Sequence, residues 1–223
     1  MSLKLLDDLY NKIDKFRGFG PKNLILFEKL CGDRLLDIIF HLPSSLIKRL
    51  KIKDLKNEYL FKRVIVNGKI NKTWFSNKAP KISIVSIEVN NQKLEIIYFN
   101  VNKNWFSNNF IINNNIIISG ELTKKGNKYQ IIHPDIIQKK DSEEIIPIYE
   151  TTYPLTAGLS HKKIKTAIKY SIESVPEFSE WINKDLLKSY NWYSFNQSLY
   201  KLHFPKNKEE IDNNNLYRER LAY

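Results

Sequence analysis

Between residues 61 and 140 the hydrophobic side chains recur at every second position in short segments. This period of two is typical of β-strands that bury one face. The segments are residues 64–70, 81–89, 93–100, 114–122 and 128–134. Asn-Asn at 90–91 and Lys-Lys-Gly-Asn at 124–127 are typical of hairpin turns, because Asn and Gly adopt positive φ at low cost. With a longer loop at 101–113, the five strands predict an OB-type β-barrel, although an SH3-like barrel would give a similar pattern.

The sixty residues before the barrel have helical patterns instead. Leucines and an isoleucine at helical spacing predict an amphipathic helix over residues 2–15. A second helix is expected from Pro21 to Leu30, because proline suits a first helical turn. A third is expected over residues 33–42, with Asp33 as its N-cap, and it should end before Pro43.

The residues after 140 change character again. An extended segment with two prolines is followed by a helix that has Ser160 as its N-cap. Short helices then lead to a last helix that reaches the end of the sequence. We therefore expect an α+β fold in three segments: a helical region at 1–60, a five-stranded OB-fold barrel at 61–140, and a linker with short helices at 141–223.

Basic residues are concentrated in the barrel segment. The sequence has a formal net charge of +12, and residues 61–140 contain 13 basic and 4 acidic side chains. The codon bias of an AT-rich genome is one explanation, but it should raise the lysine content everywhere. A surface that binds a polyanion such as nucleic acid would favour one segment, as is seen here.

The sequence lacks the motifs of several enzyme classes. It has no GxxxxGK[ST] loop for nucleotide phosphates, no GxSxG or HExxH motif, and one cysteine, so an internal disulfide is excluded. The four histidines lie near prolines or at a helix start, and we interpret them as capping or packing residues. We expect no catalytic residue, no metal site and no ATPase activity from this chain alone.

No targeting or membrane segment is evident. The longest apolar runs are strand-sized, well below the ~18–20 residues of a membrane span, and the amino terminus lacks the apolar core of a secretion signal. We therefore expect a cytoplasmic protein with no membrane partner.

Aromatic residues gather at the end of the third strand and in the loop that follows it. Tyr98 shares one strand face with Leu94 and Ile96, which we assign to the core, whereas Phe99 lies on the other face. Two interpretations stay open for Phe99: it fills the barrel, or it is exposed for stacking on a nucleic-acid base. Trp105, in the loop, is a second candidate for stacking.

Basic side chains of the first two strands and their connecting loop would hold the nucleic-acid backbone by phosphate contacts. The candidates are Lys62, Arg63, Lys69, Lys72, Lys78 and Lys81, together with Lys103 in the loop after the third strand.

A further candidate is the turn Gly-Phe-Gly-Pro-Lys at 18–22. Between two helices, Gly18, Gly20 and Lys22 would form a helix-hairpin-helix turn whose backbone approaches a phosphate. The alternative is a tight turn that only joins two packed helices.

Several motifs occur together in one order. They are FRGFGPKNLILFEKL, LLDIIFHLPSSLIKR, VNGKI, EIIYFN, IIISGEL, YQIIHPD, IPIYETTYPLTAGLSHKKIKTAIK and LYKLHFPKNKEE, with YRERLAY at the end. Their order and spacing resemble the amino-terminal part of the bacterial ATP-dependent DNA helicase RecG. The resemblance covers nearly the whole sequence, and FHLP, HPD with PIY, and YPLTAGLS are specific in combination.

The resemblance implies an OB-fold wedge domain followed by two RecA-like motor domains, which use ATP and Mg²⁺. In the family the wedge splits nascent strands from their templates at stalled replication forks and Holliday junctions. The motor is not in this sequence, which would then be a fragment or the product of a truncated gene. The implied partners are branched DNA and the motor domains in cis, and we expect a monomer.

The resemblance also implies residue roles. Phe99, in the EIIYFN motif, would stack on the base at the branch point. Some members have a second aromatic four residues later, where this sequence has Lys103, so either Trp105 replaces it or the contact is lost. Two other functions stay open: a protein-docking module, and a stand-alone OB protein that binds single-stranded nucleic acid.

Overall fold

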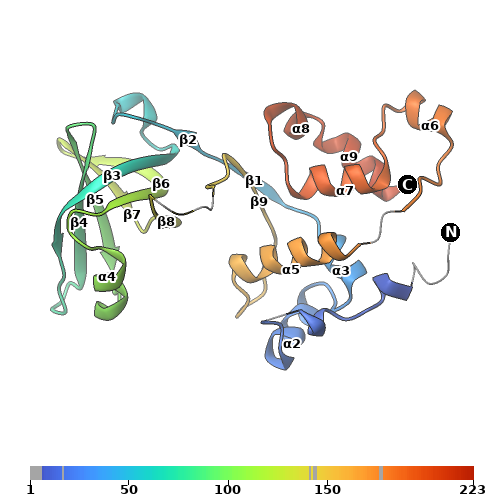
Figure 1. Ribbon diagram of the computed structural model, residues 1–223, viewed down its shortest axis with the longest axis horizontal. Helices are drawn as coiled ribbons and strands as arrows, with labels where there is room; N and C mark the ends of the chain where they lie inside the picture. Colours follow the sequence, from blue (N-terminus) through green and yellow to red (C-terminus); the bar gives the residue numbers. More distant parts are fainter. Residues whose placement is uncertain (1–6, 17, 141, 143–144, 176–177) are drawn as a thin grey trace. The chain divides into compact units, whose positions relative to one another are not determined.

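The computed structural model describes residues 7–16, 18–140, 142, 145–175 and 178–223 (Figure 1). They form two compact units. The barrel unit is Lys48–Ile148, and the helical unit combines the described parts of Met1–Ile47 and Tyr149–Tyr223. The sequence predicts three consecutive segments, 1–60, 61–140 and 141–223, whereas the contacts group the described residues before 48 with those after 148 and extend the barrel unit from 48 to 148.

The barrel unit is built on five strands, all of which the period-two pattern predicted. They are β3 (Arg63–Trp74), β4 (Ile82–Val89), β5 (Gln92–Phe99), β6 (Asn115–Lys125) and β7 (Lys128–Ile132). The strand order is β3-β4-β5-β7-β6, and β3 also pairs with β6, which closes the barrel. The β5–β7 pair is parallel, and the other pairs are antiparallel. This closed five-stranded order, with a long connection between its third and fourth strands, is that of an OB-fold and confirms the predicted α+β class.

The two predicted hairpin turns are present. Asn90 and Asn91 have φ of 46° and 62°, and they join β4 to β5 with Val89 opposite Gln92. Gly126 has a φ of 58° in the turn from β6 to β7. Both turns use the positive φ for which Asn and Gly are suited.

The sequence predicted a loop between β5 and β6, but this region is partly helical. It contains α4 (Lys103–Asn109), which lies at one end of the barrel (Figure 1). The Asn102 side chain caps the helix by accepting hydrogen bonds from the backbone N–H groups of Asn104 and Trp105. Short strands β2 (Leu50–Lys51) and β8 (Ile136–Lys139), and the 3₁₀ helix η2 (Asn57–Tyr59), complete the unit and were not predicted.

Alternate residues of the barrel strands fill one continuous core, to which α4 contributes Phe106. The core consists of Ile52, Leu55, Val64, Val66, Ile70, Val85, Ile87, Val89, Leu94, Ile96, Tyr98, Phe106, Phe110, Ile116, Ile118, Leu122 and Ile131. The assignment of Tyr98 to the core is therefore confirmed, and Phe106 and Phe110 belong there as well.

The helical unit contains a two-stranded sheet and several helices. The strands are β1 (Ser45–Lys48) and β9 (Tyr149–Thr152). The helices are η1 (Ile13–Lys15), α2 (Pro21–Leu30), α3 (Leu35–Ile39), α5 (His161–Ser174), α6 (Lys184–Ser189), α7 (Phe195–His203), α8 (Lys208–Asp212) and α9 (Asn214–Ala222). In the described part of the chain, none of the helices is long and apolar enough to cross a membrane.

Two helix predictions are confirmed and two need correction. The bounds of α2 are as predicted, and Ser160 caps α5 by accepting from the Lys163 N–H. The predicted helix over 2–15 does not continue through its described part. The Ile13 N–H donates to the Asp33 carbonyl at 2.9 Å and the Leu35 N–H donates to the Asn11 carbonyl at 3.0 Å, so the Ile13 N–H and the Asn11 carbonyl are not bonded within one continuous helix over 2–15.

The second correction concerns the start of α3. Asp33 is not its N-cap, because the helix starts at Leu35 and the Asp37 carboxylate accepts from the Arg34 N–H. The Asp33 carboxylate instead lies 2.6 Å from the Lys12 ammonium.

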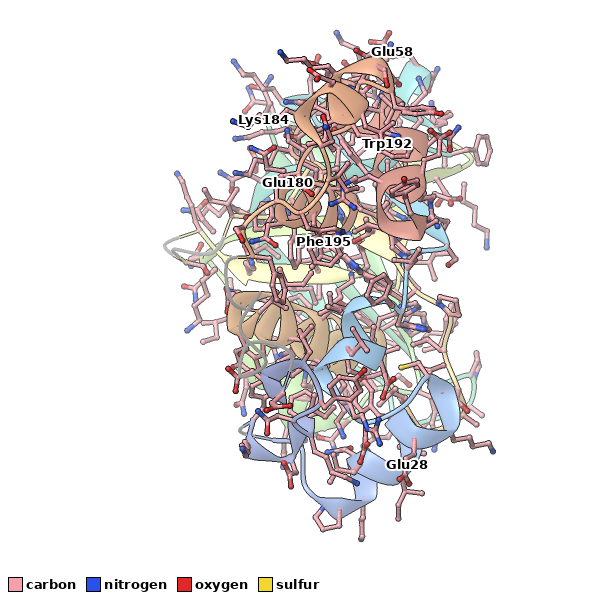
Figure 2. All side chains as sticks on the ribbon, turned by 90° about the vertical axis from the view of Figure 1, so that its right-hand side faces the viewer. Glu28, Glu58, Glu180, Lys184, Trp192 and Phe195 are labelled. Atoms are coloured by element: carbon pink, nitrogen blue, oxygen red, sulfur yellow. The ribbon has the colours of Figure 1, made fainter. Side chains whose placement is uncertain are left out.

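A buried charged cluster organises the C-terminal helices of the helical unit. The Arg220 guanidinium is 1% exposed and lies 2.8 Å from the Glu180 carboxylate. Glu180 also accepts from the backbone N–H of Ile182 and Phe195, both at 3.0 Å, and Figure 2 shows Glu180 near Phe195. The Arg220 charge further lies 4.8 Å from the ring centre of Trp181. These contacts join α9 to the segment around residue 180 and to the start of α7.

Candidate nucleic-acid interface

On the outside of the barrel, the side of β4 and β5 that points away from the core is apolar at one end. Phe99 of β5 is paired with Ile82 of β4, and Ile97 is paired with Ile84. Residues that are directly paired project from the same side of a sheet. Trp74 is opposite Ile84 and Ile132 is opposite Ile97, so β3 and β7 extend the same surface. We call this surface the β4–β5 face: Trp74, Ile82, Ile84, Ile97, Phe99 and Ile132.

Phe99 occupies the end of β5 on this face. Its side chain is 41% exposed, so it is not a core residue of the barrel, unlike its neighbour Tyr98, which is 3% exposed. The Phe99 backbone N–H donates to Nε2 of His133 at 3.2 Å, and the two rings lie 5.6 Å apart. The Phe99 ring is therefore accessible to solvent, while its backbone and one side of the ring contact His133.

Trp105 is positioned by the capped helix α4. Its ring is half-exposed and contacts Tyr98 edge-on at 5.4 Å and Phe110 at 5.9 Å. His133 contacts Tyr98 as well, at 5.5 Å. Phe99 and Trp105, the two exposed rings, are thus connected through His133 and Tyr98, and both rest on the barrel core.

Four of the predicted basic residues belong to the same part of the barrel. Lys72 is opposite Ser86, so it shares the outward side of β3 and β4. Lys78 and Lys81 lie in the β3–β4 connection, and the Lys81 carbonyl accepts from the Asn100 N–H at 3.0 Å, directly after Phe99. Lys103 is the first residue of α4. All four side chains are exposed and add positive charge to this part of the barrel.

The other predicted basic residues are not brought to this site. Lys62 and Arg63 are at the start of β3, roughly 30 Å along the strand from Lys72 at the usual rise per residue. Arg63 lies 3.2 Å from the Asp135 carboxylate, an ion pair within the barrel unit. Lys69 is opposite Glu88, whose charge offsets its own.

The candidate phosphate-binding turn lies in the helical unit. Gly18 has a φ of 92°, a conformation that favours glycine, and its carbonyl accepts from the Asn23 side chain at 2.8 Å. Gly20 precedes α2 as its N-cap residue, and Lys22 is exposed. The 3₁₀ helix η1 precedes the turn, so in the described residues no hairpin of two α-helices forms here. The tight-turn interpretation accounts for the hydrogen bonds.

His133 lies at the candidate site, which the sequence did not indicate. It was interpreted as a capping or packing residue, and its hydrogen bond and ring contacts are of that kind. Only the parallel pairing of β5 with β7 brings it beside Phe99. Trp74 is the last residue of β3 and is 51% exposed on the β4–β5 face.

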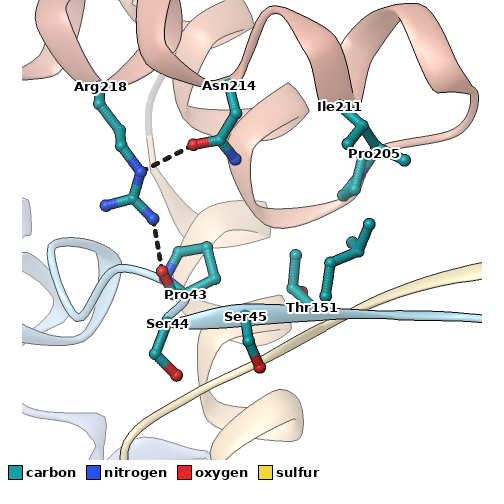
Figure 3. A pocket seen from close by; sticks show the side chains of 9 residues that line it. Pro43, Ser44, Ser45, Thr151, Pro205, Ile211, Asn214 and Arg218 are labelled. Carbon is teal, nitrogen blue, oxygen red and sulfur yellow. Dashed lines mark hydrogen bonds between the residues drawn. The ribbon is translucent and has the colours of Figure 1, made fainter.

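A pocket in the helical unit offers a different kind of site (Figure 3). Its volume is ≈ 440 Å³, and Ser44, Ser45 and Arg218 contribute polar groups. Arg218 Nε donates to Asn214 at 2.7 Å and Nη2 donates to the Pro43 carbonyl. The Ser44 hydroxyl donates to the Thr152 carbonyl, and the Ser45 hydroxyl lies 2.5 Å from the Thr152 hydroxyl. These polar groups therefore have partners within the helical unit, and we assign the pocket no ligand.

Neither unit presents a metal centre among the residues that the structure describes, since no three His, Cys, Asp or Glu side chains are grouped to hold an ion. Burial and the nearby Asp37 charge raise the pKa of the Cys31 thiol to about 12, which disfavours its thiolate form.

Several known proteins are similar to this chain. Residues 12–175 match the family model of the RecG wedge domain. The ATP-dependent DNA helicase RecG of Staphylococcus epidermidis is 25% identical over 215 residues, which are 95% of this chain and 30% of that protein. The Staphylococcus aureus helicase of the same name is 22% identical over 218 residues. This chain thus spans about 30% of the length of these relatives.

A solved structure gives the same fold. The structure of RecG bound to a three-way DNA junction superposes with a TM-score of 0.75 at 20% identity, and the match covers 96% of this chain and 29% of that one. Because the family model covers well over half of the residues, the chain belongs to the RecG wedge-domain family.

Proposed function

We propose that this chain is the DNA-binding wedge region of a RecG helicase and that it binds branched DNA through the β4–β5 face. In this proposal Phe99 stacks on a base at the branch point, and Lys72, Lys78, Lys81 and Lys103 contact phosphates around it. ATP hydrolysis belongs to motor domains that act on the same DNA. The forks and Holliday junctions of recombination and repair are the proposed substrates.

The observation that carries the proposal is the location of Phe99. The Phe99 ring is half-exposed at the end of a barrel strand, its backbone N–H is hydrogen-bonded to His133, and the β3–β4 connection beside it carries exposed lysines. The ring therefore has no role in the barrel core. The same strands form the surface with which OB-folds bind oligonucleotides. The RecG structure bound to a three-way junction supports branched DNA as the substrate class.

The test is a comparison of DNA shapes by fluorescence anisotropy. A three-way junction, a duplex and a single strand of matched length are titrated with the chain at several salt concentrations. We expect the junction to bind most tightly, with an affinity that falls as salt rises because bound cations are released from DNA. Equal affinity for all three shapes would remove the proposed preference for junctions but leave general DNA binding.

The lysines can be tested in the same assay. Replacing Lys72, Lys78 and Lys81 by glutamine should lower the slope of log affinity against log salt by about 0.7–0.9 for each lost phosphate contact. Replacing Lys188, an exposed lysine of α6, is the matched control and should leave the slope unchanged. An unchanged slope in the triple variant would contradict the proposed phosphate contacts.

A second candidate function, protein docking, rests on exposed rings in the helical unit. Tyr190 stacks on Trp192 at 4.6 Å, and Trp192 contacts Tyr223 at 5.3 Å. Tyr190 and Tyr223 are 54% and 70% exposed. If the chain ignored all three DNA shapes but bound separately produced motor domains, docking would replace DNA binding as its function.

A further inference from the structure

The parallel pairing of β5 with β7 ends in an unusual way at Phe99. The pairing runs to Ile97 opposite Ile132, and the His133 N–H donates to the Ile97 carbonyl at 2.9 Å. In a regular parallel ladder the next hydrogen bond would run from the Phe99 N–H to the carbonyl of residue 133. Here the acceptor is instead the side chain of that residue, His133 Nε2, at 3.2 Å.

The backbone conformation explains why the His133 side chain, and not its carbonyl, accepts this hydrogen bond. His133 has a φ of 45°, so the chain turns away from the ladder at this residue and its carbonyl no longer follows the strand. Asn100, which follows Phe99, has a φ of 55° and its N–H donates to the Lys81 carbonyl. Without the imidazole, the last N–H of β5 would have no acceptor from the β7 side, and the strand end at Phe99 would be held only on the β4 side.

The imidazole also supports the phenyl ring itself. Its centre lies 5.6 Å from the Phe99 ring and 5.5 Å from the Tyr98 ring, which it meets edge-on. Tyr98 is buried, so His133 is fixed to the core on one side and holds Phe99 on the other. Since Nε2 accepts a hydrogen bond, the neutral ring carries its proton on Nδ1.

We propose that His133 is a positioning residue that orients Phe99 for stacking at the DNA branch point. The proposal rests on the proposed function. A ring that is already ordered loses less conformational entropy when a base stacks on it, so the imidazole raises junction affinity without touching DNA.

Two variants separate the acceptor from the bulk of the side chain. His133→Gln keeps an acceptor near the position of Nε2, whereas His133→Leu keeps a similar volume without one. In the full chain we expect His133→Leu to weaken junction binding roughly three- to tenfold, the usual effect of one hydrogen bond. His133→Gln should restore most of this loss.

A double-mutant cycle tests whether His133 acts through Phe99. In a Phe99→Ala background, His133→Leu should have no further effect on junction affinity. An equal loss in both backgrounds would overturn the proposal, because His133 would then act on DNA binding by another route. Unchanged affinity in His133→Leu alone would overturn it as well.

A measurement without DNA separates this inference from the proposed function. Amide hydrogen exchange by NMR should show protection of the Phe99 N–H in the natural chain and in His133→Gln, and its loss in His133→Leu, with the buried amides of β4 unchanged. Equal protection in all three proteins would overturn the proposal. If protection follows the prediction but no variant or parent binds junctions, the proposed function fails and the positioning role fails with it.

Discussion

Arg49 Nη2 lies 2.6 Å from the Asp135 carboxylate, although 86 residues separate the two in sequence. The Arg49 side chain is 1% exposed, and its other nitrogens donate to the Ser119 hydroxyl at 2.8 Å and the Pro147 carbonyl at 3.2 Å. One guanidinium thus ties the first residues of the barrel unit to β6 and to the segment that leaves the unit. A buried charge of this kind is tolerated only while its partners are in place.

Asp135→Asn should destabilise the barrel strongly, because it leaves the buried Arg49 charge without its carboxylate. The expected loss is about 3–5 kcal/mol of unfolding free energy. Urea unfolding followed by circular dichroism measures it. Glu121→Gln, an exposed acidic residue of β6, is the matched control and should change little. Equal stabilities of the two variants would show that the pair is not needed for folding.

The same carboxylate should make the barrel sensitive to acid. Burial alone would raise the pKa of Asp135, but the hydrogen bond and charge of Arg49 outweigh it and hold the pKa below its ordinary value. A lowered folded-state pKa gives stability that is present above the ordinary value of about 4 and is lost as pH falls below it. In Asp135→Asn this acid-dependent part of the unfolding free energy should be smaller.

His203 should give the helical unit a different pH dependence. Its ring is buried, Nε2 donates to the Ile39 carbonyl at 2.9 Å, and Nδ1 lies 3.0 Å from the Tyr153 hydroxyl. Burial, with smaller contributions from the His41 and Arg218 charges, lowers the pKa of His203 to about 4, whereas the Ile39 carbonyl partly opposes the shift.

As the pH falls, His203 of the unfolded chain binds a proton near its ordinary pKa of about 6.5, whereas His203 of the folded chain binds it only near pH 4. Stability should therefore be complete above pH 6.5 and fall by about 3 kcal/mol as the pH drops towards 4. Urea unfolding of the natural chain and of His203→Gln across this range should show a flatter profile for the variant. His161→Gln, at an exposed position, is the control. Parallel profiles for all three proteins would contradict the assignment.

Neighbouring aromatics of β5 should respond to truncation in opposite ways. Phe99→Ala should weaken junction binding by about 1–3 kcal/mol, the usual value of a stacked base. Tyr98→Ala should instead lower the unfolding free energy by about 3–5 kcal/mol, because it empties a filled core. Phe61→Ala removes an equally large ring that is 76% exposed elsewhere on the barrel unit, and it should affect neither quantity. A loss of stability without a loss of binding in Phe99→Ala would favour a packing role.

The cap of α4 should matter more than the helix's length indicates. Asn102→Ala removes the acceptor for two backbone N–H groups and should cost about 1 kcal/mol of unfolding free energy. Asn102→Ser keeps an acceptor and should retain most of the stability. Asn104→Ala, at the second residue of α4, is the control. If Asn102→Ala and Asn104→Ala had equal stability, the cap would not contribute.

The barrel could be predicted from sequence because the signals for its strands and turns lie within each short segment. Each of its five strands alternates between core and surface, as in Leu94, Ile96 and Tyr98 of β5, and its hairpins need the Asn and Gly residues that mark them. The short strands β1, β2, β8 and β9 span two to four residues each, which is too few for a period to emerge.

Where the prediction was wrong, a distant segment determined the local structure. Residues 11–13 have a helical pattern, but their backbone groups bond to residues 33–35. The helix α4 was hidden by its asparagines, although the Asn102 cap and the four-residue spacing of Phe106 and Phe110 were available signals. The sequence indicated a capping or packing residue at His133, but not that it lies beside Phe99, since this depends on which strand lies beside β7.

The chain passes from the helical unit into the barrel unit after β1 and returns before β9, and these two strands are paired. Just inside the barrel unit, the Arg49 N–H donates to the Ile148 carbonyl at 2.7 Å, so the two ends of the barrel unit meet. Bringing the ends of a flexible loop of about one hundred residues together would cost the chain on the order of 4 kcal/mol of entropy. A folded barrel has already closed that loop. Folding of the barrel should therefore favour folding of the helical unit through the chain itself, with no side-chain contact between them being required.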